Sequence, residues 1–268
     1  MYKLIAIDMD GTLLKDDKTI SIENYCAIQK AKEAGVKIVL ATGRPLNGIK
    51  KYLSHLDLIT EHDYTVVFGG AAVLNNKTEK IISRNILDLK DWNYLFSLSQ
   101  KLKINIHVLT ETSCITPKDN KYSNQEAAMN NIPLIIDNPT NMKENLTLIK
   151  IMFIDEPALI SEAISSLPKE LYDKYTVVQS APYYLEFLNI NANKGLGVKA
   201  LAKSLNIKQE EVICIGDAGN DTDMVLYAGL GVAMENGFEE LKEVANFITL
   251  SNENHGVAHV INKFIFNN

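Results

Sequence analysis

The chain has 268 residues, of which 46% are hydrophobic and 22% are charged, and its formal net charge is −6. This composition excludes a disordered chain, and the acidic balance argues against general binding to nucleic acid or to an anionic membrane. Cys26, Cys114 and Cys214 are odd in number and far apart, with no CxxC pair, so they neither form a disulfide framework nor suggest a zinc site.

The first third of the chain alternates strand and helix patterns. Apolar runs predict strands at 3–7, 36–41 and 64–68. Ser21 is suited to cap a helix that stops at Gly35, and Pro45 suits the first turn of a helix that ends near Leu56. This alternation predicts right-handed crossovers and a parallel sheet with helices on both faces.

The middle of the chain has a different pattern. After a predicted hairpin around Asn75 and Asn76, helices are expected at 88–102, 119–129 and 156–167, with strands at 105–109, 146–154, 175–179 and 184–188. His107 and Glu186 alternate with apolar neighbours, which predicts strands with one face in water. We interpret 83–190 as an inserted α+β domain.

The alternation of strands and helices returns after Lys194. A helix at 195–205, a strand at 211–215, a helix at 221–227 and a strand at 231–234 precede two further helical stretches. The prediction is therefore an α/β fold in which residues 1–82 and 191–268 form one doubly wound parallel sheet, interrupted by the inserted domain.

Two aspartates follow the first predicted strand, in the sequence KLIAIDMDGT. If strand geometry continues to Asp10, the carboxylates of Asp8 and Asp10 leave the same face, because side chains alternate along a strand. Two carboxylates about 4 Å apart repel by roughly 4 kcal/mol at an effective dielectric constant of about 20. A cation, a shared proton or solvent must compensate this repulsion, although Asp-Gly is also ordinary turn chemistry.

A second acidic loop, GDAGND, follows the apolar strand EVICI and contains Asp217 and Asp221. In open parallel sheets, ligands lie beyond the carboxyl ends of the strands, so Asp8, Asp10, Asp217 and Asp221 are expected on one rim. Such a group of carboxylate oxygens suits Mg²⁺, a hard ion with few protein ligands.

Basic and hydroxyl groups at helix starts favour a phosphate on the same rim. Lys194 opens a predicted helix, where the helix dipole favours an anion instead of a cation, so an anion between Lys194 and the helix end would explain its place. Thr42 and Gly43 end the second strand just before a helix and can bond phosphate oxygens. One aspartate of the first pair could then attack phosphorus while the other transfers a proton.

Four ordered motifs, DMDGTLL, ATGRP, Lys194-Gly195 and GDAGNDTDM, resemble those of the haloacid dehalogenase superfamily of phosphatases. The insertion resembles the α/β cap of the Cof-type, sugar-phosphatase-like branch, and the tail SNENHGVAHVI is similar to the closing segment of that branch. The resemblance implies a Rossmann-like core with an inserted cap, and it covers nearly the whole chain.

The resemblance also implies roles for individual residues. It makes Asp8 the nucleophile and Asp10 the acid and base, with Mg²⁺ held by Asp8, the main-chain carbonyl of Asp10, and Asp217, and with Asp221 supporting the metal site. It assigns the phosphoryl group to Thr42, Gly43, Lys194 and Asn220. The sequence departs from the branch at Phe68–Ala71, which reads FGGA where FNGA is usual, so Gly69 has no amide side chain for a contact there.

Other functions fit parts of the sequence. A phosphotransferase or phosphomutase would share the aspartyl-phosphate step and differ only in the acceptor. The segment GLGVKA, from Gly195 to Ala200, fits the glycine pattern of a dinucleotide-binding oxidoreductase, but it does not follow a strand directly. A protein that keeps the fold without the chemistry is a further alternative.

The expected partner is a small phosphate ester, and we expect no nucleic acid or membrane partner, a monomer or weak homo-oligomer, and a cytoplasmic location. Asp8 interrupts the first apolar run, which does not fit a signal peptide. The substrate is left open among sugar phosphates, phosphorylated flavin precursors, pyridoxal phosphate and nucleotides. Candidates for contacts from the cap are His107, Tyr183, Tyr184 and Glu186.

Overall fold

The computed structural model describes residues 1–137 and 146–267. The chain divides into two compact units, the first formed by Met1–Arg84 with Asn193–Asn268 and the second by Asn85–Ala192. Each is described by itself below. No helix of the described residues is long and apolar enough to cross a membrane.

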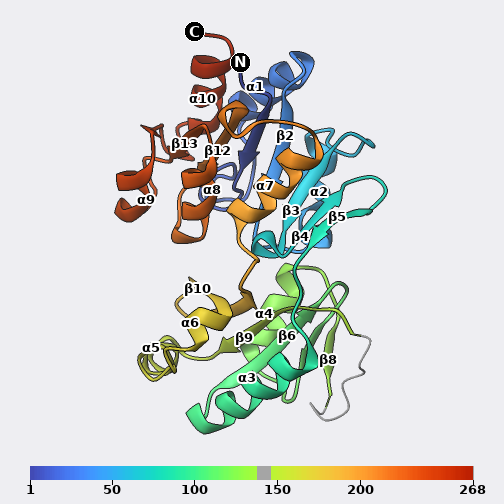
Figure 1. Ribbon diagram of the computed structural model, residues 1–268, viewed down its shortest axis with the longest axis vertical. Coiled ribbons are helices and arrows are strands. Elements are labelled where there is room, and N and C mark those ends of the chain that lie inside the picture. Colours follow the sequence, from blue (N-terminus) through green and yellow to red (C-terminus); the bar gives the residue numbers. More distant parts are fainter. Residues whose placement is uncertain (138–145, 268) are drawn as a thin grey trace. The chain divides into compact units, whose positions relative to one another are not determined.

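Unit 1 contains an eight-stranded sheet in the order β14-β13-β12-β1-β2-β3-β4-β5 (Figure 1). Its strands are β1 (Leu4–Ile7), β2 (Lys37–Ala41), β3 (Tyr64–Val67), β4 (Ala72–Asn75), β5 (Ile81–Arg84), β12 (Val212–Gly216), β13 (Leu230–Ala233) and β14 (Phe247–Ile248). The strands from β14 to β3 are parallel, whereas β4 and β5 pair antiparallel. The parallel α/β fold expected from the sequence is confirmed, as is the hairpin at Asn75 and Asn76.

Helices flank the sheet of unit 1. They are α1 (Ile22–Glu33), α2 (Leu46–His55), α7 (Lys194–Ser204), α8 (Thr222–Tyr227), α9 (Glu239–Val244) and α10 (Gly256–Ile265). Ser21 caps α1 by accepting a hydrogen bond from the backbone N–H of Asn24. Leu4, Ala6 and other side chains of one sheet face share a buried apolar cluster with α7 and α8, while α1 packs against α10.

Unit 2 contains a six-stranded sheet in the order β10-β11-β9-β6-β7-β8. Its strands are β6 (Asn105–Thr110), β7 (Cys114–Thr116), β8 (Leu134–Ile136), β9 (Leu148–Ile154), β10 (Tyr175–Ala181) and β11 (Tyr184–Asn189). Its helices are α3 (Leu89–Leu102), α4 (Lys121–Met129), α5 (Pro157–Ser165) and the short α6 (Leu171–Lys174). The sequence did not predict β7, β8, α6 or the two-residue β14 of unit 1, because segments this short carry little periodicity.

Two apolar clusters hold unit 2 together. The larger contains Trp92 and Leu95 of α3 and Ile160 of α5, packed on the sheet face of Ile151 and Phe153. The smaller contains residues of α4 on the face of Met152 and Ile154. Because side chains alternate along β9, α3 and α5 lie on one face of this sheet and α4 on the other.

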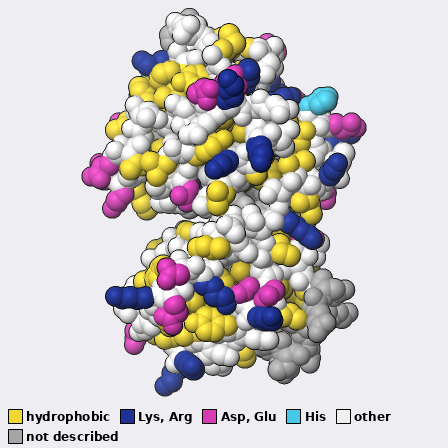
Figure 2. All heavy atoms as spheres, viewed as in Figure 1, with side chains coloured by type: hydrophobic (Ala, Val, Ile, Leu, Met, Phe, Trp, Pro, Cys, Tyr) yellow, Lys and Arg dark blue, Asp and Glu magenta, His cyan; other side chains and the backbone are white. Residues whose placement is uncertain are grey.

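Burial of the second face corrects the prediction that strands of this region have one face in water. His107 is fully buried and Glu186 is 8% exposed. Alternation of polar and apolar residues shows that a strand has two different faces. It does not show whether water or another element of the same chain covers the polar face. Figure 2 shows charged side chains of both signs scattered over the visible surface.

Candidate active site

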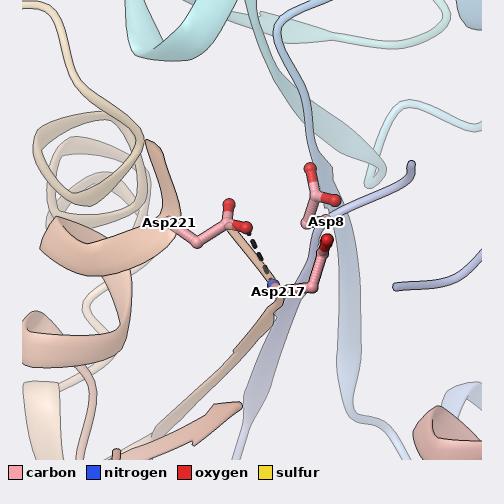
Figure 3. Close-up of side chains that lie close together, drawn as sticks. All are labelled: Asp8, Asp217 and Asp221. Atoms are coloured by element: carbon pink, nitrogen blue, oxygen red, sulfur yellow. Dashed lines mark hydrogen bonds between the residues drawn. The ribbon is translucent and has the colours of Figure 1, made fainter. Parts of the chain in front are cut away.

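Three aspartates converge at the carboxyl ends of β1 and β12. Asp8 follows β1 directly, Asp217 follows β12, and Asp221 ends the 3₁₀ turn η4 (Gly219–Asp221). The two strands are parallel neighbours with Ile7 opposite Ile215, so their ends meet at one edge of the sheet. One carboxylate oxygen from each aspartate lies within 4.8 Å of the others (Figure 3).

Lys194 lies between two of these acids. It is the first residue of α7, and its ammonium Nζ is 2.5 Å from Oδ1 of Asp8 and 2.7 Å from Oδ1 of Asp221. Its side chain is 1% exposed. A buried lysine is retained only when its charge is paired, and here two carboxylates from different loops pair it. The predicted place of Lys194, at a helix start beside the acidic rim, is what the structure shows.

Backbone contacts fix the acidic loops. Oδ2 of Asp221 accepts a hydrogen bond from the backbone N–H of Asp217 at 3.0 Å (Figure 3). It also accepts one from the backbone N–H of Ala218 at 3.1 Å. The Thr12 hydroxyl donates to Oδ1 of Asp217 at 2.8 Å. Gly11 has a φ of 88°, and a Cβ at this position would collide with the Asp217 carboxylate. The turn after β1 therefore needs glycine both for its conformation and for the approach of Asp217.

The three acids outnumber the single lysine, and this imbalance shifts their protonation. Burial, followed by the charge of Asp221, raises the pKa of Asp8 well above its ordinary value, against the lowering effect of Lys194. Burial and Asp221 likewise raise the pKa of Asp217 to about 6. Burial opposes the charge of Lys194, but Asp221 and Asp8 outweigh it and raise the lysine pKa. The site therefore favours an additional cation.

Asp10 lies outside this group of three carboxylates. β1 ends at Ile7, and the chain turns, so the carboxylate of Asp10 meets Arg44 and Lys18 instead. Arg44 donates from Nε and Nη2 to the two carboxylate oxygens at 2.8 and 2.7 Å. Burial tends to raise the pKa of Asp10, but the hydrogen bonds and charges of Arg44 and Lys18 outweigh it and lower the pKa. The repulsion expected between Asp8 and Asp10 is thus compensated on each side by basic residues.

The other candidates for phosphate binding lie in the loops after β2 and β12. Thr42 follows β2 and is buried, and its hydroxyl oxygen accepts the Arg44 backbone N–H at 3.1 Å. A Cβ on Gly43 would meet no atom within 4 Å, so space is open beside this backbone. Asn220 lies in η4 and is half-buried. All three belong to unit 1, as do Lys194 and the acidic group.

The departure at Gly69 has a conformational explanation. Gly69 has φ 64° and ψ 24°, in the left-handed region that glycine and asparagine tolerate better than other residues. Its backbone N–H donates to the Thr42 carbonyl at 2.9 Å. Glycine therefore preserves the backbone that an asparagine would form here, but it supplies no amide group.

The glycines of GLGVKA serve helix packing. A Cβ on Gly195 would collide with the backbone carbonyl of Asp223, and one on Gly197 would collide with Val66. Both glycines thus allow α7 to approach neighbouring parts of unit 1 closely. This contact explains the glycine pattern without a dinucleotide.

Most of the unit 2 side chains proposed for substrate contact are buried or form hydrogen bonds within unit 2. The ring nitrogens of His107 lie 2.9 Å from the Ser123 hydroxyl and 3.1 Å from the Met152 sulfur. Burial, with a smaller effect of Lys150, lowers the pKa of His107 to about 3, so the ring is neutral. The Tyr184 hydroxyl donates to a backbone carbonyl of α4, and Tyr183 is half-buried.

Sequence reasoning missed the residues that balance charge in both units. Arg44 and Lys18 on Asp10 were not assigned, although Arg44 lies within the ATGRP motif. In unit 2, Lys150 lies 3.0 Å from Glu186 and 3.5 Å from Glu126. Lys150 is flanked by apolar residues in LIKIMFI, so a charged residue in an otherwise buried strand was the available signal.

Comparison with known proteins agrees with this geometry. The sequence pattern of the family described as haloacid dehalogenase-like hydrolase matches residues 5–261. The protein named "Putative phosphatase YxeH" from Bacillus subtilis (strain 168) is 44% identical over 267 residues, covering 99% of both chains. The chain therefore belongs to the haloacid dehalogenase-like hydrolase family, and the resemblance noted in the sequence is confirmed.

Two further relatives give the same result. The 5-amino-6-(5-phospho-D-ribitylamino)uracil phosphatase YitU from Bacillus subtilis (strain 168) is 32% identical, covering 97% of both chains. The crystal structure of a haloacid dehalogenase-like hydrolase from Bacteroides thetaiotaomicron is 30% identical and superimposes with a TM-score of 0.86, covering 98% of this chain and 99% of that one. The match over whole chains makes this protein a hydrolase of that family, of the phosphatase class.

The residues present fit a divalent metal ion. Asp8 and Asp217 offer carboxylate oxygens without histidine or thiolate, which is the donor chemistry of Mg²⁺. Both oxygens of Asp221 already accept hydrogen bonds, from Lys194 and from two backbone N–H groups. Asp221 is therefore better suited to hold its neighbours in place than to bind the metal directly.

Proposed function

We propose that this phosphatase is Mg²⁺-dependent and hydrolyses a small phosphate ester through an aspartyl-phosphate intermediate on Asp8. One observation carries the proposal: Asp8 lies at the carboxyl end of the central strand, buried and fixed by Lys194, beside two further carboxylates. A positioned carboxylate of this kind is suited to nucleophilic attack.

In the first step, a carboxylate oxygen of Asp8 attacks phosphorus, and the bond from phosphorus to the alcohol oxygen breaks. Asp10 gives a proton to that alcohol oxygen. In the second step, Asp10 takes a proton from water, whose oxygen attacks phosphorus, so that Asp8 is regenerated and inorganic phosphate leaves. The sum of the two steps is hydrolysis of the ester.

The remaining polar groups of the site hold the phosphoryl group. Lys194 neutralises charge on its oxygens, and the open space beside the Gly43 backbone allows an oxygen to approach that N–H. The Thr42 hydroxyl and the Asn220 amide complete the set of donors. Asp221 orients Lys194 and the loop of Asp217 through the contacts described above.

Asp8, Asp217 and the main-chain carbonyl of Asp10 would hold Mg²⁺, with Asp221 supporting the loop. When bound, the ion neutralises the phosphoryl oxygens as a Lewis acid. Without a cation, the acidic group would repel a phosphate dianion, which supports the assignment. Activity should disappear in excess EDTA and return with Mg²⁺, and Ca²⁺ should substitute poorly because it is larger and takes more ligands. Full activity in excess chelator would contradict the metal assignment.

Unit 2 is proposed as the cap that selects the substrate. The support is the family resemblance and the chemistry of unit 1, which contains every residue assigned to phosphoryl transfer. A cap can contact the leaving group and exclude water from the reaction.

The decisive experiment measures phosphate release from a panel of esters with Mg²⁺ present. The panel contains p-nitrophenyl phosphate, sugar phosphates, pyridoxal phosphate, nucleotides and 5-amino-6-(5-phospho-D-ribitylamino)uracil, the compound in the name of one relative. We expect release from p-nitrophenyl phosphate and a higher kcat/KM for at least one metabolite. No release from any ester by folded, metal-loaded protein would refute the proposed function.

A further inference from the structure

A second cationic group lies beside the phosphoryl site of unit 1. Arg44, from the loop after β2, and Lys18, from the loop after β1, both contact the carboxylate of Asp10. This group differs from Lys194, which contacts Asp8 and Asp221. Asp8 and Asp10 thus meet different basic side chains, at two separate positions of unit 1.

The Arg44 guanidinium is held in place from several sides. Its side chain is 17% exposed, and its Cζ lies 5.8 Å from the centre of the Tyr52 ring. The Arg44 backbone N–H donates to Thr42, and its carbonyl accepts the N–H of Phe68 at 3.1 Å. Fixing a long basic side chain this way costs rotamer entropy, but it prepares the planar fork for a carboxylate or phosphate.

Arg44 and Lys18 have more positive charge and more hydrogen-bond donors than Asp10 pairs with. Arg44 and Lys18 carry two positive charges against the single charge of Asp10, and Asp10 engages two of the five guanidinium N–H groups. Nearby acids of the loop point elsewhere: Asp17 accepts hydrogen bonds from Thr19, and Asp16 accepts one from Asn252. The surplus positive charge is therefore not taken up by these acids; the Arg44 side chain is 17% exposed and that of Lys18 is 53% exposed, so an added anion can reach both.

We propose that Arg44 and Lys18 form an anion subsite for the substrate, in which an anionic oxygen of the bound phosphate ester takes the place of the Asp10 carboxylate. The exchange breaks the Arg44–Asp10 pair and frees Asp10 to turn toward the leaving-group oxygen. It rests on the proposed function in one respect, the role of Asp10. The anionic oxygen comes either from the phosphoryl group itself or from a second acidic group on the alcohol part.

The test uses inhibition constants measured against p-nitrophenyl phosphate hydrolysis, so the ligands need not be substrates. The ligands are inorganic phosphate, glycerol 2-phosphate and 2-phosphoglycerate, of which the last two differ by a carboxylate in place of a hydroxymethyl group. The variants are Arg44→Met, Arg44→Lys and Lys18→Met. The control is Lys51→Met, because Lys51 lies against the same Tyr52 ring without contacting Asp10.

We expect Arg44→Met to raise the inhibition constant of at least one ligand about tenfold or more, as loss of a charge-assisted hydrogen bond does. Arg44→Lys and Lys18→Met should have smaller effects, and Lys51→Met none. A rise for all three ligands identifies the phosphoryl group as the source of the oxygen. A rise confined to 2-phosphoglycerate identifies a second acidic group and a substrate class that carries one.

Unchanged inhibition constants for all three ligands in folded Arg44→Met protein would overturn the proposal, even if its kcat falls, because Arg44 would then only position Asp10. The absence of millimolar inhibition of the wild type by any of them would also overturn it. Failure of the proposed function is distinguishable, since wild-type protein would then not hydrolyse p-nitrophenyl phosphate at all.

Discussion

Each unit of this protein contains a buried lysine between two carboxylates. In unit 1, Lys194 lies 2.5 and 2.7 Å from Asp8 and Asp221. In unit 2, Lys150 lies 3.0 and 3.5 Å from Glu186 and Glu126. The residue types and the burial are nearly the same, so the charge pattern alone does not separate a reactive site from a structural one.

The two clusters differ in the parts of the fold that supply them. Lys194 begins a helix, and its partners lie in loops at the carboxyl ends of parallel strands, next to the partly exposed Asp217. Lys150 and Glu186 lie within β9 and β11, and Glu126 lies within α4, which covers that face of the sheet. Loop residues at strand ends leave room for a ligand, whereas residues within packed elements use their charges on one another.

The pKa shifts have the same directions in the two clusters. In unit 1, burial and then the charge of Asp221 raise the pKa of Asp217 to about 6, which suits a site that takes up a cation. In unit 2, burial raises the pKa of Glu126 against the lowering effect of Lys150. Burial opposes the charge of Lys150, but Glu186 and Glu126 outweigh it and raise the lysine pKa. The second cluster lies within packed strands and a helix, so the comparison predicts that its loss affects stability more than catalysis.

The largest expected effect tests the Lys194 cluster, where we propose that the reaction takes place. Asp8→Asn should lower kcat on p-nitrophenyl phosphate by about 10⁴-fold or more, because the amide keeps the shape but lacks the attacking oxyanion. Phosphate release measures the rate, and circular dichroism checks the fold. Asp223→Asn is the matched control, because Asp223 is exposed two residues beyond Asp221. A rate for Asp8→Asn near that of the control would show that Asp8 is not the nucleophile.

The next effect tests the structural cluster. Lys150→Met should reduce the free energy of unfolding of unit 2 by about 3–5 kcal/mol, because two buried carboxylates lose their cation. Trp92, the single tryptophan and part of the buried core of unit 2, reports this unfolding in urea by its fluorescence. Lys101→Met, at an exposed position in α3, should change it little.

Recovery of stability sharpens this test. Adding Glu126→Gln and Glu186→Gln to Lys150→Met should restore part of the lost free energy, since no unpaired charge is left buried. Folded Lys150→Met protein should keep the kcat of the wild type on p-nitrophenyl phosphate. A loss below about 1 kcal/mol, or a large loss of kcat in folded protein, would show that the two clusters do not divide stability and catalysis as the comparison requires.

The matching substitution in unit 1, Lys194→Met, should reduce catalysis more than stability. Lys194→Met should lower kcat/KM by about 10²–10³-fold, the cost of removing one preorganised group from a developing oxyanion. Excess Mg²⁺ should preserve the fold, because the ion offsets the charge of the acids. Lys199→Met, on an exposed face of the same helix, serves as the control. If Lys194→Met kept wild-type kcat/KM, Lys194 would be a structural ion pair like Lys150.

These two lysines also show how far the sequence could be interpreted. The sequence indicates Lys194 because it begins a helix pattern and lies third in an ordered set of four motifs, after DMDGTLL and ATGRP and before GDAGNDTDM. It does not indicate Lys150, because a single charged residue in an apolar strand does not show which distant side chain pairs with it. For the same reason, the alternation of polar and apolar residues at His107 and Glu186 wrongly predicted strands with one face in water.

Most helices and strands could be predicted from the sequence, whereas contacts between distant loops could not. Strands and helices of unit 1 with clear periodicity were predicted closely, since their burial pattern repeats along the chain. The place of the Asp10 carboxylate was not, because it depends on a turn after Ile7 and on Arg44, which is 34 residues away. Contacts between distant loops depend on tertiary packing, and local pattern does not encode them.

The smallest predicted effect concerns pH and Mg²⁺ binding to the Lys194 cluster. Asp217 has a pKa of about 6 because of burial and Asp221, and Asp8 has a raised pKa as well. A carboxyl whose pKa is raised is protonated as the pH falls below that value, and a protonated ligand must release its proton before it binds a cation. Affinity for Mg²⁺, measured by calorimetric titration from pH 5 to pH 8, should therefore weaken as the pH falls, by at least about tenfold per unit below pH 6. Proton release measured in two buffers of different ionisation enthalpy should rise over the same range.

Asp217→Asn should bind Mg²⁺ more weakly and with a shallower pH dependence, because one titrating ligand is gone. An affinity that stays constant down to pH 5 would mean that these carboxylates do not bind the ion. The acidic cluster of unit 1 would then be an internally satisfied network, like that of unit 2.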